Sequence, residues 1–364
     1  MTIDARIAKH LPPTSDSPAF DLDIHLQAPA AITVLFGPSG SGKTLTLNCV
    51  AGFTKPDHGR ILINDRLLFD HATNVHVPPQ ARRCGYLFQD HALFPHMSVR
   101  ENLLFAARVS RTGKRGMAQR RLVNELLDAF ELGELAGRRP AQLSGGQKQR
   151  AALARILVTE PEAVLLDEPA RGLDARLKQS FFQVLRDMRE RLNCPMLLVT
   201  HDLDECFELA EYVCLLDRGQ FLQAGRRQEV LSRPSSAEAA RLLGIYSIVP
   251  GEIRALDPSR DTSTLVVEGQ EITARYFPGH LIGDRGIVCI REPDIEASAI
   301  RGRVLAGHIA LALLQTTASR EGVRLHLQAG INATVSEAIY NRELRGETRI
   351  QLHIPPSAVS FVAG

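Results

Sequence analysis

Short apolar runs alternate with longer amphipathic stretches over the first two thirds of the chain. The runs at residues 32–36, 163–166 and 196–199 contain no charged residue, which predicts strands buried on both faces of a sheet. Residues 175–192 place apolar side chains at helical spacing, namely Leu177, Phe181, Val184, Leu185 and Met188. Strands that alternate with helices indicate a parallel sheet covered by helices, so this part is predicted to be α/β.

Residues 97–160 differ from this pattern and are predicted to be mostly helical. Ser98 can cap a helix over residues 99–108, because Glu101 follows it three positions later. Helical character continues over residues 122–130, and a basic loop, residues 111–121, separates the two stretches. We therefore expect a helical subdomain within the α/β part.

The pattern changes after the Arg-Pro-Ser-Ser sequence at residues 233–236. A short helical piece at 237–243 leads into segments rich in Gly and Pro, where apolar and polar residues alternate at 323–328 and 350–354. Alternation of this kind is typical of strands with one buried face. The prediction is an α/β domain at residues 1–235, a linker at 236–250 and a small β-rich domain at 251–364.

Composition narrows the class of protein. The chain has 364 residues, with 43 Lys and Arg against 41 Asp and Glu, which fits two globular domains with a formal net charge of +2. This balance, 5% aromatic residues and no Trp argue against a nucleic-acid partner. No run approaches the roughly 18 apolar residues of a membrane span, and the charged N-terminus does not resemble a signal peptide. The six cysteines form no C-x-x-C pair, so no zinc site is predicted.

A phosphate-binding loop follows the first apolar run. Residues 37–44 match G-x-x-x-x-G-K-[ST] in full, with Gly37, Pro38, Ser39, Gly40, Ser41, Gly42, Lys43 and Thr44. Glycines let backbone N–H groups turn toward phosphate oxygens, and the helix that follows directs its positive end at the same anion. We expect Lys43 to reach the terminal phosphates and Thr44 to ligate Mg²⁺. The chain should therefore bind a nucleoside triphosphate with Mg²⁺.

A second acidic element ends the apolar run at residues 163–166. Asp167 comes directly after this strand, where a carboxylate can hold Mg²⁺ directly or through water. Glu168 stands one residue further, where it can accept a proton from an attacking water.

The sequence Leu-Ser-Gly-Gly-Gln at residues 143–147, followed by a helical run, resembles the signature of ABC transporter ATPases. Ser-Gly-Gly at the start of a helix is a second anion cradle, which one chain does not need for one nucleotide. The resemblance implies a head-to-tail homodimer in which each signature completes the partner's ATP site. The residues that would act in trans are Ser144, Gly145, Gly146, Gln147 and Asp174.

Three further segments match the same family in order. Gln89 resembles the Q-loop glutamine, which implies contact with Mg²⁺ or the attacking water. Residues 199–202 resemble the switch-histidine segment, which implies that His201 contacts the γ-phosphate, and Asp174 matches the D-loop aspartate. The resemblance covers residues 1 to 235 and implies an ATP hydrolase. Its catalytic residues would be Glu168, His201 and Gln89, and its Mg²⁺ ligands Thr44, Gln89 and Asp167.

Two positions depart from the family pattern. Arg171 stands where the family usually has a small hydroxyl residue. This arginine either changes communication between the two sites or is a solvated residue at the rim of the interface. The family also stacks adenine on an aromatic residue upstream of the loop, but residues 4–17 offer only His10, and Phe20 is expected to lie too close to the strand. Stacking is therefore expected to be weak or to come from elsewhere.

The transported solute is suggested by resemblance alone. Residues 85–99 resemble ATPases of importers of small anions, and residues 68–70 and 77–79 look most like the molybdate importer ATPase. Residues 289–295 and 300–305 resemble an OB-type (TOBE- or Mop-like) β-domain, which in molybdate systems can bind the oxyanion and inhibit transport. Sulfate, ferric iron and sugar importers carry similar domains. Alternatively, this domain only dimerises or packs.

The resemblance also implies partners and a location. It implies an integral membrane permease subunit, indirectly a periplasmic or extracellular substrate-binding protein, and a peripheral position on the cytoplasmic face of the membrane. Phe94, His96 and Met97 follow Gln89, where the family receives a short helix of the permease; alternatively, these residues only pack at the start of the next helix. One rival is a soluble ABC ATPase acting on nucleic acid or the ribosome, although the long insertion or second cassette of that class is not found in the sequence. Another is a regulatory oxyanion module with a degenerate ATPase, against which the intact Lys43, Asp167, Glu168 and His201 argue.

Overall fold

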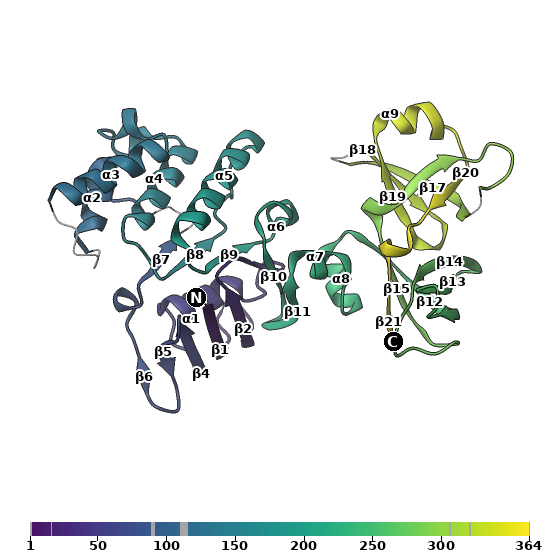
Figure 1. Ribbon diagram of the computed structural model, residues 1–364, viewed down its shortest axis with the longest axis horizontal. Coiled ribbons are helices and arrows are strands. Elements are labelled where there is room, and N and C mark those ends of the chain that lie inside the picture. Colours follow the sequence, from purple (N-terminus) through teal and green to yellow (C-terminus); the bar gives the residue numbers. More distant parts are fainter. Residues whose placement is uncertain are drawn as a thin grey trace. The chain divides into compact units, whose positions relative to one another are not determined.

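The computed structural model describes residues 2–15, 17–88, 92–109, 116–305, 307–319 and 322–363. Contacts divide the chain into two compact units, Met1–Arg227 and Gln228–Gly364, each of which is described by itself (Figure 1).

The first unit is built on a six-stranded sheet in the order β11-β10-β3-β9-β8-β7. The strands are β3 (Ile32–Phe36), β7 (Cys84–Leu87), β8 (Ala163–Asp167), β9 (Met196–Thr200), β10 (Tyr212–Asp217) and β11 (Gln220–Arg226). All are parallel except β11, which pairs antiparallel with β10. Every residue of β3, β8 and β9 is buried, which confirms the buried strands predicted from the three uncharged runs.

A second sheet in this unit is antiparallel, in the order β2-β1-β4-β5-β6. Its strands are β1 (Thr2–Leu11), β2 (Phe20–Pro29), β4 (His58–Ile63), β5 (Arg66–Asp70) and β6 (Val75–His76). Helix α1 (Lys43–Ala51) places Leu47, Cys49 and Val50 in one apolar core with side chains of both sheets. The start of α1, and with it the glycine-rich loop, is thereby held by burial.

Helices complete the first unit. They are α2 (Val99–Val109), α3 (Met117–Ala129), α4 (Gly145–Leu157), α5 (Ala175–Leu192) and α6 (Leu203–Leu209), with the 3₁₀ turns η1 (Pro79–Ala81), η2 (Gly133–Leu135) and η3 (Pro140–Gln142). The predicted helical subdomain is confirmed, since α2, α3 and α4 lie together at one end of the unit (Figure 1). Ser98 and Glu101 form the expected reciprocal cap, with Ser98 N donating to Glu101 Oε2 over 2.7 Å.

The predicted basic loop at residues 111–121 needs a correction. Residues 110–115 lie outside the described part of the chain, whereas α3 already begins at Met117 and includes Arg120 and Arg121. Arg121 pairs with Glu125 one turn later, over 2.9 Å. The basic residues thus continue into an amphipathic helix whose buried face holds Val123, Leu126 and Leu127.

The second unit is β-rich, as predicted, with two five-stranded sheets in the orders β14-β13-β12-β15-β21 and β16-β20-β17-β18-β19. The strands are β12 (Tyr246–Asp257), β13 (Thr262–Val267), β14 (Gln270–Arg275), β15 (Arg285–Arg291), β16 (Glu296–Ala299), β17 (His308–Ser319), β18 (Gly322–Leu327), β19 (Asn332–Val335), β20 (Arg349–His353) and β21 (Val359–Ala363). Its helical elements are α7 (Arg227–Ser232), α8 (Ala237–Leu243), α9 (Glu337–Ile339), η4 (Glu292–Asp294), η5 (Gln328–Gly330), the π-turn η6 (Tyr340–Leu344) and η7 (Pro356–Ala358). All adjacent strand pairs in both sheets are antiparallel, and side chains of both sheets share one core.

The segment predicted as a linker, residues 236–250, contains α8 and the start of β12. Ser236 caps α8 by accepting a hydrogen bond from Ala239 N over 3.0 Å, and Ala239 and Ala240 are fully buried. The Tyr246 hydroxyl donates to Leu231 O over 2.8 Å. The contacts divide the chain after residue 227, and the serine at residue 236 that suggested a linker acts instead as a helix cap.

Among the residues that the structure describes, no helix is long and apolar enough to cross a membrane.

Candidate nucleotide-binding site

The glycine-rich loop joins the end of β3 at Phe36 to the start of α1 at Lys43. Gly42 has a left-handed φ of 104°, and a Cβ atom there would lie 2.9 Å from Leu22 Cδ1. A Cβ atom on Gly37 would lie 2.1 Å from the Leu216 carbonyl oxygen on β10. Backbone conformation and close packing therefore both require glycine in this turn.

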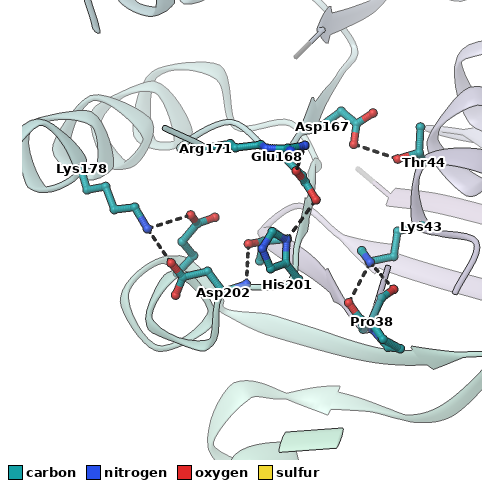
Figure 2. A network of polar contacts seen from close by, with 12 residues as sticks. Pro38, Lys43, Thr44, Asp167, Glu168, Arg171, Lys178, His201 and Asp202 are labelled. Atoms are coloured by element: carbon teal, nitrogen blue, oxygen red, sulfur yellow. Dashed lines mark hydrogen bonds and ion pairs between the residues drawn. The ribbon is translucent and has the colours of Figure 1, made fainter. Parts of the chain in front are cut away.

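The side chain of Lys43 folds back onto the loop that precedes α1. Its ammonium donates to the carbonyl oxygens of Gly37 and Pro38, each over 2.7 Å, and the residue is 5% exposed (Figure 2). Burial lowers the pKa of Lys43, while the nearby charges of Glu168 and Asp167 act in the opposite direction. Within the described residues, the buried Ser41 hydroxyl of the same loop has no hydrogen-bond partner. A buried ammonium beside an unpaired hydroxyl suits a phosphate group.

Thr44 and Asp167 come together next to this lysine. Thr44 Oγ1 donates to Asp167 Oδ1 over 3.0 Å, and Asp167, the last residue of β8, is 5% exposed. Burial raises the pKa of the Asp167 carboxyl, and the Thr44 hydrogen bond opposes that shift. A hydroxyl and a carboxylate are oxygen donors of the kind that Mg²⁺ takes beside a phosphate, so the residues fit this ion.

Glu168 is held from two sides. Its Oε1 lies 3.0 Å from His201 Nδ1 and its Oε2 lies 3.0 Å from Arg171 Nη1, with the carboxylate between them in Figure 2. The side chain of Glu168 is 14% exposed and that of His201 is 55% exposed. Glu168 and His201 directly follow the parallel strands β8 and β9, so both lie at the carboxyl edge of the sheet.

An apolar cavity of about 530 Å³ lies beside the loop. Its lining includes Leu11, Phe20 and Leu45, together with Lys43 and Glu168. Phe20 pairs with Leu11 across β1 and β2, and its Cζ is 3.1 Å from the Cβ position of Gly42.

Phe20 therefore corrects the expectation that it lies too close to the strand to reach this region. It stands at the start of β2, where Leu22, Ile24, Leu26 and Ala28 are buried. Extending this alternation backward by two residues places Phe20 on the same face, so the signal was present in the sequence.

The signature residues cap helix α4. Ser144 Oγ accepts from Gln147 N over 3.4 Å, and Gln147 Oε1 accepts from Ser144 N over 3.0 Å. Asp174 caps α5 by accepting a hydrogen bond from Leu177 N over 2.9 Å. A Cβ atom on Gly146 would lie 3.3 Å from Leu177 Cδ2, so the signature and the D-loop helix are in contact.

The structure thus gathers Lys43, Thr44, Asp167, Glu168 and His201 in one place, as Figure 2 shows. Ser144, Gly145, Gly146, Gln147 and Asp174 are held separately, at the N-termini of α4 and α5. Gln89, predicted to contact Mg²⁺ or the attacking water, lies outside the described residues.

The segment after Gln89 is anchored by a buried amide. Asn102, fully buried on α2, accepts a hydrogen bond from Phe94 N over 2.9 Å and donates to the carbonyl oxygens of Phe94, Met97 and Ser98. The Phe94 ring meets Phe105 edge-on with centroids 5.0 Å apart, and Phe105 is 41% exposed. Hydrogen bonds to Asn102 therefore hold the loop that carries Phe94 beside an exposed ring of α2.

Comparison with known proteins agrees with this geometry. The family model for ABC transporters matches residues 21–171. The chain is 37% identical to the molybdenum import ATP-binding protein ModC of Paramagnetospirillum magneticum, over 69% of this chain and 68% of that protein. For the protein of the same name from Pseudomonas fluorescens the identity is 37%, over 81% and 77%. The sulfate/thiosulfate import ATP-binding protein CysA 2 of Agrobacterium fabrum is 42% identical, over 61% of this chain and 64% of its own length.

Solved structures include a similar fold. The ATP-binding cassette MJ0796, in a dimeric post-hydrolysis state bound to ADP and phosphate, matches with a TM-score of 0.53 and 27% identity. The match covers 62% of this chain and 98% of that one. From the loop, the signature, the fold and these relatives together, the chain belongs to the ABC transporter family, among the ATP-hydrolysing, ATP-binding subunits of importers.

Proposed function

We propose that this chain hydrolyses MgATP as a homodimer and thereby drives an importer of a small oxyanion, with molybdate as the first candidate. The observation that carries the catalytic part is the convergence of Thr44, Asp167, Glu168 and His201 on the glycine-rich loop. These groups come from the ends of separate parallel strands and from the start of α1, and they meet at one edge of the sheet, which is the positioning that phosphoryl transfer requires.

Each residue has a role that follows from its position. Lys43 and the loop amides would hold the phosphates, and Thr44 and Asp167, with Gln89, would hold Mg²⁺. The ion would neutralise the charge of the phosphate oxygens. Glu168 would accept the proton of the attacking water, and His201 would hold the γ-phosphate. Most of the acceleration would then come from positioning and charge.

The base of the nucleotide would lie in the apolar cavity. Leu11, Phe20 and Leu45 line it next to Lys43, so a phosphate on the loop leaves the nucleoside facing these side chains. An aromatic ring and two aliphatic chains can hold a purine face without reading its edges.

The signature would act on the ATP of a second copy. Gly145 and Gly146 belong to the first turn of α4, whose backbone N–H groups have no partner within the helix, and among the described residues nothing lies within 4 Å of the Cβ position of Gly145. The relative solved as a dimer with ADP and phosphate supports this arrangement. Ser144, Gly145, Gly146, Gln147 and Asp174 would then complete the partner's site.

The transport partner would be an integral membrane permease at the cytoplasmic face, supplied by an external binding protein. The Phe94–Phe105 pair, anchored by Asn102, offers an apolar surface for it. Molybdate is favoured by the two ModC relatives, whereas relatives named for sulfate and for spermidine or putrescine keep other solutes as alternatives. The role of the second unit as an oxyanion sensor stays a prediction.

The test has two stages. Purified full-length chain should hydrolyse ATP only with Mg²⁺; Glu168→Gln should bind ATP and accumulate as a dimer, and Lys43→Ala should not bind. A fully active Glu168→Gln variant would remove Glu168 from the role of base. Next, vesicles containing the chain and its permease should take up labelled molybdate in an ATP-dependent manner. Uptake of sulfate or spermidine instead of molybdate would overturn the molybdate assignment, whereas the proposed ATP hydrolysis would remain supported.

A further inference from the structure

Arg171 is placed by the turn that follows β8. Glu168 has a left-handed φ of 45°, and Arg171 N donates to Glu168 O over 3.2 Å. Leu173 N then donates to Ala170 O over 3.3 Å. These two successive turns bring the Arg171 side chain back onto the carboxylate three residues before it.

The two side chains of the Arg171–Glu168 ion pair differ strongly in solvent exposure. The Arg171 side chain is 66% exposed, whereas that of Glu168 is 14% exposed. An ion pair with such an exposed partner contributes little to stability, so stability does not explain it. The other charged groups around Glu168 are Lys43, Asp167 and His201. Among the described contacts of Glu168, Arg171 is the one that holds Oε2 from the solvent side.

The two contacts of Glu168 are not equivalent during hydrolysis. His201, which holds Oε1, is the residue that would turn to the γ-phosphate, so Oε1 is the oxygen that becomes available to water. Arg171 can remain on Oε2 throughout, because it comes from the same turn as Glu168. A carboxylate that is hydrogen-bonded through one oxygen keeps its orientation while the other oxygen accepts a proton.

We propose that Arg171 is a positioning residue that fixes Glu168 through Oε2 and leaves Oε1 to accept the proton of the attacking water. In that step the water O–H bond breaks and its proton goes to Oε1. The water oxygen bonds to the γ-phosphorus, and the bond from that phosphorus to the β,γ-bridging oxygen breaks with its electrons leaving on ADP. The inference rests on the proposed function and names a residue that the family pattern does not supply.

Substitutions at residue 171 separate positioning from packing. Serine, the type of residue usual in the family, is too short to reach Oε2, whereas lysine restores a charge with a single donor instead of a planar fork. We expect Arg171→Ser to lower kcat about tenfold or more, while KM for ATP and the ATP affinity measured by calorimetry stay within about twofold. Arg171→Lys should recover part of the loss. The matched control is Arg121→Ser, which removes an exposed ion pair on α3 and should leave kcat unchanged.

A second readout needs no turnover. In nucleotide-free protein with ¹⁵N-labelled histidine, the ring signals of His201, assigned by their loss in His201→Gln, should shift in Arg171→Ser, because both side chains hold one carboxylate. In a Glu168→Gln background, Arg171→Ser should lower the residual rate no further.

Unchanged kcat in Arg171→Ser, an unshifted His201 signal, or an equal loss in the Glu168→Gln background would each overturn the positioning role. If Glu168→Gln itself is fully active, the proposed base fails, which is a different result from the failure of Arg171 alone.

Discussion

Thr44 Oγ1 donates a hydrogen bond to Asp167 Oδ1 over 3.0 Å, although 123 positions separate the two residues in the sequence. The sheet order explains this contact, because only β9 lies between β3, which leads to Thr44, and β8, which ends at Asp167. All three strands are parallel, so their carboxyl ends lie at one edge. The pair is the geometric core of the proposed metal site.

Asp167→Asn should weaken the binding of Mg²⁺, so that ATP hydrolysis requires a higher Mg²⁺ concentration. Asparagine keeps the shape and can still accept from Thr44, but it lacks the negative charge that a hard cation needs. We expect the Mg²⁺ concentration for half-maximal ATPase activity to rise about tenfold or more. ATP binding in excess chelator should be nearly the same in variant and wild type. Asp23→Asn, at an exposed position of β2, is the control and should follow wild type.

Phe20→Ala should weaken ATP binding through the base alone. An aromatic face contributes about 1 kcal/mol or somewhat more beyond its buried area, which corresponds to about a five- to tenfold rise in Kd. Calorimetry with ATP and with inorganic triphosphate separates the effects, since triphosphate should bind both forms equally. Phe105→Ala removes an exposed ring of the same type from α2 and should leave both constants unchanged. Equal loss of triphosphate affinity in Phe20→Ala would mean that the loop, which Phe20 also contacts, has moved.

The parallel sheet could be predicted because β3, β8 and β9 are buried on both faces, which leaves uninterrupted apolar runs in the sequence. The antiparallel sheet of the first unit was missed. Residues 2–11 alternate apolar and charged side chains only partly, and β1 becomes regular through its pairing with β2 and β4. The pairing of β1 with β4 joins segments that are distant in the sequence, which neither segment encodes alone, whereas the strict alternation of β2 could be read from residues 20–28.

The site was predicted where chemistry determines residue type, as at Lys43, Thr44, Asp167 and Glu168. The contact between Arg171 and Glu168 could not be predicted, because it depends on a left-handed φ at Glu168. Glutamate rarely adopts this conformation, and nothing in the residue type indicates it. The sequence shows that Arg171 departs from the family pattern, but it does not show whether this arginine lies at the rim of an interface or acts on the site. The turn that places its guanidinium on Glu168 Oε2 supports the second interpretation.

Glu205→Gln should change the pH dependence of stability. Glu205, on α6, is 3% exposed, and this burial raises the pKa of its carboxyl. The Thr200 hydroxyl and Lys178 lower that pKa, whereas the charge of Asp202 raises it further. A carboxyl with a raised folded-state pKa binds its proton more tightly in the folded chain, so its contribution to stability is lost as pH rises through that pKa. The free energy of unfolding of wild type should therefore fall, relative to Glu205→Gln, as pH rises from about 4.5 upward.

Denaturant titrations at about pH 4.5 and about pH 7.5 measure this difference. Glu208→Gln, on the same helix with its side chain 44% exposed, is the control and should change the unfolding free energy by less than about 0.5 kcal/mol at either pH. A Glu205→Gln curve parallel to wild type between the two pH values would contradict the assignment of burial as the dominant cause.

Glu292→Gln should loosen the second unit. Glu292 is 5% exposed, and its carboxylate accepts from Ser247 Oγ over 3.2 Å, from Asn332 Nδ2 over 3.1 Å and from Arg324 Nη2 over 2.7 Å. Ser247 belongs to β12 of one sheet, whereas Arg324 and Asn332 belong to β18 and β19 of the other. One carboxylate thus links the two sheets.

Glutamine at residue 292 would remove the charge and turn an N–H₂ group toward donors, which should destabilise this unit by about 1–3 kcal/mol. Hydrogen–deuterium exchange of the full chain should show faster exchange in β12, β18 and β19 and unchanged exchange in β3 and β8. Glu296→Gln, at an exposed position of β16, is the matched control and should exchange like wild type. Equal protection of all strands in Glu292→Gln would show that core packing alone holds the sheets together, since the shared carboxylate would then contribute nothing measurable.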